Sequence, residues 1–62
     1  MDKIEVQVTG TDANVFALIG LVSRALKDAD QRAEAAEMAH RVMDTGSYNE
    51  ALTVMMEYAD LV

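Results

Sequence analysis

The sequence contains no cysteine, no proline and no tryptophan, and its one histidine is His40. Without cysteine a chain of 62 residues has no disulfide to support it, and a zinc site needs three or four ligands. We therefore expect residues 1–62 to form a single small domain that gains stability from self-association or from a partner. The lack of cysteine, and an N-terminus without the apolar core of a signal peptide, favour the cytoplasm.

Positive charge is also scarce, because five lysines and arginines oppose eleven acidic residues and leave a net charge of −6. Such a chain lacks the basic surface that binds phosphates, so we expect no direct contact with nucleic acid. Hydrophobic residues make up 52% of the sequence, which excludes a disordered acidic tail. The longest apolar run, residues 15–22, is far shorter than the roughly 20 residues that cross a membrane, so no membrane association is expected.

The N-terminal residues alternate in polarity, with Ile4, Val6 and Val8 separated by polar side chains. A period of two predicts a strand with one buried face, and Gly10 ends it. A solitary strand leaves backbone donors and acceptors unpaired, so something must pair with it. Two candidates stand open: residues 58–62 turned extended, or the same strand of a second chain in an antiparallel dimer.

The central segment predicts the first of three helices, beginning at Thr11 or Asp12, which are both good N-caps. Its apolar side chains follow helical spacing and cover most of its circumference, so it should be covered on several sides. Gly20 at its centre costs about 1 kcal/mol relative to alanine unless it allows another backbone to approach closely. The apolar residues are Val15, Phe16, Ala17, Leu18, Ile19, Leu21, Val22, Ala25, Leu26 and Ala29.

Two further helices follow a break at residues 28–30. Apolar side chains at positions 33, 36, 39, 42 and 43 mark the second helix, and Gly46 is its expected left-handed C-terminal cap. Ser47 and Glu50 form a capping box that starts the third. The predicted fold class is α+β and mostly helical, in the order strand, helix, helix, helix, with a short C-terminal strand as one option for pairing.

Candidate chemical sites are weak throughout the chain. His40 lies one helical turn from Glu37, Arg41 and Asp44, but a lone exposed histidine supplies only one zinc ligand. Glu37 and Arg41 are four residues apart and predict a surface ion pair. Because no nucleophile stands beside a base and the core is too small for a sizeable pocket, we expect no enzyme, cofactor, metal or small-molecule substrate.

Two stretches resemble known groups of proteins. Residues 35–59, with Ala39, Gly46, Tyr48, Ala51 and Leu52, resemble half of the tetratricopeptide pattern, which implies a helical hairpin and not a stack of repeats. The segments TGTDANVFALIGLVSRAL at 9–26 and SYNEALTVMMEY at 47–58 resemble short, uncharacterised proteins of bacteria, phages and mobile elements. That resemblance implies an extended C-terminal tail and carries no activity with it.

The favoured hypothesis is a small protein-binding or accessory factor that acts as a homodimer through an apolar helix surface ringed by acidic residues. An alternative is an acidic, phage-borne or mobile-element-borne inhibitor of a host protein that binds nucleic acid. A third is a DNA-binding regulator of the ribbon-helix-helix kind, which the acidic charge disfavours. The residues expected at the interface are Phe16, Ile19, Gly20, Leu21, Met55, Met56 and Tyr58.

Overall fold

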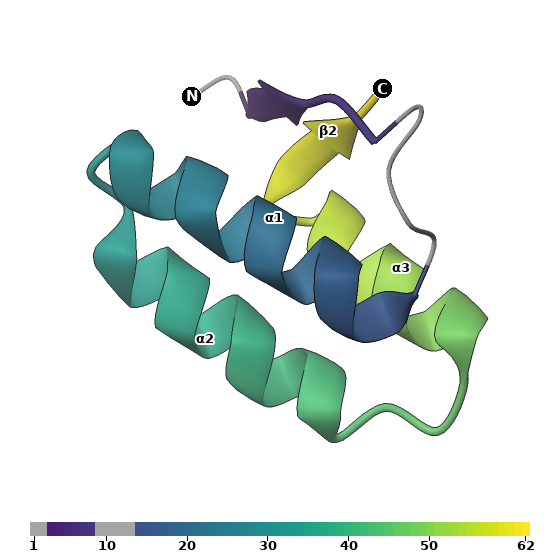
Figure 1. Cartoon of the computed structure of the whole chain (residues 1–62). Coiled ribbons are helices and arrows are strands. Elements are labelled where there is room, and N and C mark those ends of the chain that lie inside the picture. The colour runs from purple at the N-terminus through teal and green to yellow at the C-terminus, as the bar shows by residue number, and fades with distance from the viewer. Residues whose placement is uncertain (1–2, 9–13) are drawn as a thin grey trace.

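The computed structural model describes residues 3–8 and 14–62. The elements follow in the order β1 (Ile4–Val6), α1 (Val15–Asp28), α2 (Arg32–Met43), α3 (Tyr48–Met56) and β2 (Ala59–Leu61). The small sheet lies on one side of α1 and α2 lies on the other (Figure 1). The predicted α+β class, with one strand before three helices and a C-terminal strand that pairs with the first, is confirmed.

The two strands pair in parallel, with Glu5 beside Asp60 in the register. The ladder continues past β1, because the Val62 amide donates to the Val6 carbonyl at 2.9 Å and the Val8 amide donates to the Val62 carbonyl at 2.7 Å. The C-terminal residues are therefore the partner of the N-terminal strand within one chain. Parallel pairing is possible because the three helices between the strands return the chain to the same end of the sheet.

Helix α1 begins later than the sequence indicates. The Asn14 side chain accepts a hydrogen bond from the Phe16 amide at 2.8 Å and caps the helix. Thr11 and Asp12, together with Gly10, lie outside the described residues. At the other end Asp30 has φ 63°, the Asp30 amide donates to the Lys27 carbonyl, and the Gln31 amide donates to the Leu26 carbonyl. This is a Schellman cap with aspartate in the position that glycine commonly takes.

Helices α2 and α3 form a hairpin joined by the capping box. The Ser47 Oγ accepts a hydrogen bond from the Glu50 amide at 3.2 Å, which confirms the predicted start of α3. The Glu50 carboxylate accepts from the Gly46 amide at 3.3 Å, one residue before the serine. The prediction that Gly46 caps α2 is wrong, because Asp44 is the C-cap and has ordinary right-handed backbone angles.

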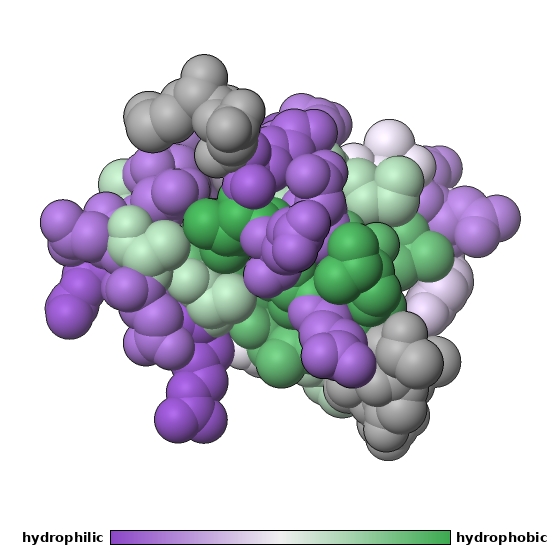
Figure 2. Space-filling model, turned by 90° about the horizontal axis from the view of Figure 1, so that it is seen from above, coloured by the Kyte–Doolittle hydropathy of each residue, from purple (hydrophilic) through white to green (hydrophobic). Residues whose placement is uncertain are grey.

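The core forms where the helices and the sheet meet. Helix α1 contributes the buried side chains of Leu18, Val22 and Leu26, which lie one turn apart. Helix α3 contributes Ala51 and Met55. In α2 the buried residues are Ala35, Met38 and Val42, and only Val42 is among the apolar positions that predict this helix. The buried set is Val6, Leu18, Val22, Leu26, Ala35, Met38, Val42, Ala51, Met55 and Ala59. Figure 2 shows the sheet side, where hydrophobic side chains gather centrally among hydrophilic ones.

Candidate docking groove

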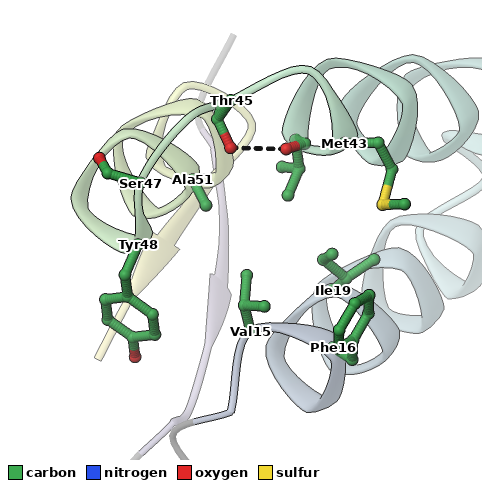
Figure 3. Close-up of a pocket in the computed structure, with 9 residues that line it drawn as sticks. Val15, Phe16, Ile19, Met43, Thr45, Ser47, Tyr48 and Ala51 are labelled. Carbon is green, nitrogen blue, oxygen red and sulfur yellow. Dashed lines mark hydrogen bonds between the residues drawn. The ribbon is translucent and has the colours of Figure 1, made fainter.

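A groove opens where the start of α1 faces the end of α2 and the start of α3. Its volume is about 280 Å³. In Figure 3, Val15 and Ile19 point from α1 into this space, and Met43 points from α2 toward Phe16 and Ile19. We call it the docking groove; it is lined by Val15, Phe16, Ile19, Val42, Met43, Thr45, Ser47, Tyr48 and Ala51.

Three of the large lining side chains are exposed, and each lies at the end of a helix. Phe16 is the second residue of α1 and 67% exposed, and Met43 is the last residue of α2 and 66% exposed. Tyr48 opens α3 and is 44% exposed. The groove therefore presents hydrophobic surface to solvent.

The hydroxyl groups at the rim are already engaged in the fold. The Thr45 Oγ1 donates to the Val42 carbonyl at 2.6 Å, and the Ser47 Oγ accepts from the Glu50 amide. Both bonds close the α2–α3 turn, so these hydroxyls hold the rim in shape. A ligand of this groove would gain most of its binding free energy from apolar contact.

The charges near the groove are negative. The segments that build it, residues 14–23 and 42–56, contain Asp44 and Glu50 and no lysine or arginine. Both carboxylates are exposed. Arg24, Lys27 and Arg32 lie toward the α1–α2 turn, away from the groove. Arg41 directly precedes the lining residue Val42, but its charge is paired with Glu57. Charge is therefore unevenly distributed along the helices, and the end that carries the groove attracts positive charge.

The predicted interface residues do not share one surface. Phe16 and Ile19 line the docking groove, whereas Leu21 is half-buried against the core. Gly20 is exposed on the outer side of α1, and a Cβ added there would meet nothing within 4 Å.

The C-terminal members of the predicted set lie elsewhere. Met55 is completely buried, so in the folded single chain it presents no surface to a partner. Met56 is exposed but does not line the groove, and Tyr58 is half-buried in a polar network. Composition and helical spacing locate Phe16 and Ile19, but they miss Met43 and Tyr48, which come from other helices. The capping box could have indicated Tyr48, since it places this residue in the first turn of α3.

The polar network ties α2 to the segment between α3 and β2. Arg41 binds Glu57 through two hydrogen bonds of 2.9 and 3.0 Å, and it donates to the Tyr58 hydroxyl at 3.0 Å. The Tyr58 hydroxyl in turn donates to Glu37 at 2.7 Å. The predicted pair between Glu37 and Arg41 is thus replaced by a chain of contacts through tyrosine. The guanidinium also lies 5.6 Å from the centre of the Tyr58 ring.

These contacts shift three pKa values. The hydrogen bond to Glu57 raises the pKa of Arg41, and the Tyr58 hydroxyl adds to this. The same hydrogen bond lowers the pKa of Glu57 below its usual 4.5. Burial raises the pKa of Tyr58 above 10. The network holds the segment between α3 and β2 against α2. The shifted pKa values keep Arg41 and Glu57 charged and Tyr58 neutral at pH 7.

No metal-binding group forms within residues 3–8 and 14–62, where no three histidine or acidic side chains converge. His40 is exposed on α2. None of the helices described is long and apolar enough to cross a membrane. Comparisons with known protein families, with curated proteins and with solved structures gave no match. The two sequence resemblances therefore remain predictions.

Proposed function

We propose that this chain is a small protein-binding factor without catalytic activity, that it acts as a homodimer, and that it binds a partner protein through the docking groove. The observation that carries the proposal is the exposure of Phe16 and Met43, at 67% and 66%, on opposite walls of one groove. Exposed apolar patches on small domains are commonly interaction sites. The cysteine-free sequence supports a cytoplasmic place of action.

The partner segment should carry positive charge beside a bulky apolar side chain. The groove offers space for an apolar anchor, and Asp44 and Glu50 provide negative charge close by with no lysine or arginine among the groove segments. Electrostatic attraction of this kind accelerates association, while apolar burial supplies affinity. An amphipathic basic helix has both properties.

Photo-crosslinking tests this proposal directly. A benzophenone amino acid at position 16 should crosslink to the partner, and the crosslinked peptide should contain lysine or arginine beside an apolar residue. The matched control places the same group at Met56, which is 49% exposed and outside the groove. Phe16→Ser should weaken capture of that partner at least about tenfold, because aromatic anchors dominate interface energies. Equal crosslinking from both positions would contradict the proposal.

A second candidate function is inhibition of a protein that binds nucleic acid. The net charge of −6 and the carboxylates beside the groove favour it, because an acidic domain can occupy a phosphate-binding surface. In that case nucleic acid should displace the chain from the captured partner, and binding should weaken steeply with salt. Simultaneous binding of nucleic acid and the chain would count against inhibition.

The ribbon-helix-helix alternative is the least favoured. In that class the outward side chains of the strand contact DNA bases, whereas here Glu5 and Asp60 lie side by side in the sheet and are both exposed. Two carboxylates on this surface repel phosphate. A gel shift with genomic fragments at low salt tests the alternative, and a specific complex would restore it.

A further inference from the structure

The outer edge of β1 has backbone groups that no described residue uses. The hydrogen bonds from Val62 to Val6 and from Val8 to Val62 show that the even-numbered residues of this segment face β2. In a strand, consecutive residues point their backbone groups to opposite edges. The N–H and C=O groups of Lys3, Glu5 and Gln7 therefore face away from β2, and these three residues are exposed.

This edge lacks the usual protection against further pairing. Natural edge strands are commonly blocked by proline, by bulges or by lysine side chains that extend past the edge. The sequence has no proline, and the register of β1 with β2 is regular. Lys3 is turned back, because its Nζ donates to the Met56 carbonyl at 2.8 Å. Among residues 3–8 and 14–62, nothing therefore prevents another strand from pairing with this edge.

We propose that a second copy of this chain pairs its β1 antiparallel with this edge, so that Lys3 of each chain lies opposite Glu5 of the other. The sheet of the dimer then has four strands, with the two β1 strands in the centre. The inference rests on the homodimer part of the proposed function and names its interface. It is independent of the docking groove, because no groove-lining residue belongs to β1.

Charge selects this register over its neighbours. Within the chain Glu5 lies beside Asp60, and the described residues give Glu5 no ion pair. With Lys3 opposite Glu5, each Lys3 exchanges its contact with the Met56 carbonyl for Glu5 of the second copy, so that two cross-strand pairs of opposite charge form symmetrically. Such pairs stabilise antiparallel sheets. A shift by two residues would place Glu5 opposite Glu5 of the second copy, which is destabilising.

The apolar face agrees with the same register. It brings Ile4 opposite Ile4 of the second copy, in a pair whose backbone groups face β2 and whose side chains therefore approach closely. Ile4 is half-buried against the core of its own chain. A contact between the two isoleucines would bury the part of each side chain that is still exposed. This contact lies on the face of the sheet where Val6 is already covered.

Backbone methylation gives a direct test, because a chain of 62 residues is accessible to chemical synthesis. An N-methyl group on Glu5 keeps its carboxylate and removes only an N–H that faces the open edge. The matched control is N-methylation of Leu61, whose N–H faces the outer edge of β2 by the same alternation. Both proteins should retain the helical circular dichroism of the parent.

Sedimentation equilibrium then measures the dimer dissociation constant. We expect the parent and the Leu61-methylated protein to dimerise alike, and methylation at Glu5 to weaken the dimer about tenfold or more, since two hydrogen bonds are lost per dimer. A monomeric parent at millimolar concentration, or an unchanged dimer after methylation at Glu5, would overturn the proposal. Neither result depends on binding through the groove, which the Phe16→Ser variant reports separately.

Charge exchange tests the register. Lys3→Glu and Glu5→Lys each place like charges opposite one another at two positions of the symmetric dimer. Each variant should weaken the dimer about threefold or more at low salt. The double variant K3E/E5K restores both pairs and should dimerise like the parent. A double variant as weak as the singles would overturn the register that we propose.

Discussion

Met55 and Met56 are adjacent in sequence and have opposite environments. Met55 is completely buried between the helices, whereas Met56 is 49% exposed and contributes its carbonyl to Lys3. Met55→Ala should leave a cavity and lower the free energy of unfolding by about 2–5 kcal/mol, which is a large part of the stability of so small a domain. Met56→Ala should change it by less than about 1 kcal/mol.

Urea denaturation followed by circular dichroism measures both variants under the same conditions. Equal losses for Met55→Ala and Met56→Ala would mean that α3 packs on a different face from the one described. The pair is a close control, since both substitutions remove the same atoms one residue apart in the chain.

Glu57 should make stability depend on pH through its pairing with Arg41. Because its pKa is lowered in the folded chain, the unfolded chain binds its proton first as pH falls. The contribution of the pair is therefore present above about pH 4.5 and is lost as the pH falls through the folded value. The effect should be small, since both side chains are about half exposed.

The Glu57→Gln variant removes this dependence. Its urea midpoint should fall less steeply between pH 6 and pH 3 than that of the parent. Glu34→Gln is a suitable control, because the described residues give Glu34 no ion pair. If the urea midpoint of Glu57→Gln fell with acid as steeply as that of the parent, the contact with Arg41 would have no effect on stability.

Among the elements, α1 shows where helical periodicity is sufficient and where it is not. The spacing of its apolar residues predicts the helix, and three of them, Leu18, Val22 and Leu26, form its buried line. The pattern cannot show which neighbours cover the remaining apolar positions. In the fold the sheet and α2 cover much of the circumference, whereas Phe16 is 67% exposed and lines the docking groove.

Gly20 gives a prediction about this helix. A Cβ at this position meets nothing within 4 Å, so glycine gives the folded single chain no close approach. Gly20→Ala should therefore raise the free energy of unfolding by about 0.5–1 kcal/mol, because alanine loses less backbone entropy in a helix. Thermal unfolding at a low concentration measures the isolated chain. A loss of stability would contradict the open surroundings of Gly20 in the single chain.

The ends of the helices were less predictable than the helices themselves. Ser47 and Glu50 predict the start of α3, since a capping box is a local interaction between residues close in sequence. Gly46 is wrongly predicted as a left-handed cap, while Asp30 takes that conformation after α1. Aspartate tolerates positive φ because its short side chain can form local hydrogen bonds, so a rule based on glycine alone misses it.

At the scale of the whole molecule, negative charge is poorly compensated. The chain carries a net charge of −6, and in the parts described one ion pair, between Arg41 and Glu57, is present. Repulsion among the carboxylates should destabilise the compact state, and salt screens it. Raising NaCl from 0.01 to 0.15 M should therefore increase Tm by roughly 2–5 °C at fixed protein concentration.

Differential scanning calorimetry measures this shift. An Asp44→Asn variant removes one negative charge near the groove and should show a smaller rise with salt than the parent. A fall of Tm with salt would contradict the expectation, because it would mean that attractive ion pairs outweigh repulsion.

The sequence is sufficient to predict the first strand, the order of the three helices, and the acidic, largely helical character of the chain. Alternation predicts β1, and periodicity together with the capping box predicts the helices, because these signals arise between residues close in sequence. Phe16 and Ile19 also stand out as candidates for an interface, since the apolar surface of α1 is wider than one neighbour can cover.

The folded structure was needed to show that the C-terminal residues pair with β1 in parallel, that Met55 is buried, and that Met43 and Tyr48 join Phe16 at one groove. These features depend on contacts between residues far apart in sequence, and local patterns carry no information about which distant segments meet. The docking groove and the open edge of β1 are both products of that packing. For the same reason, the surfaces proposed for function can be located only from the folded structure.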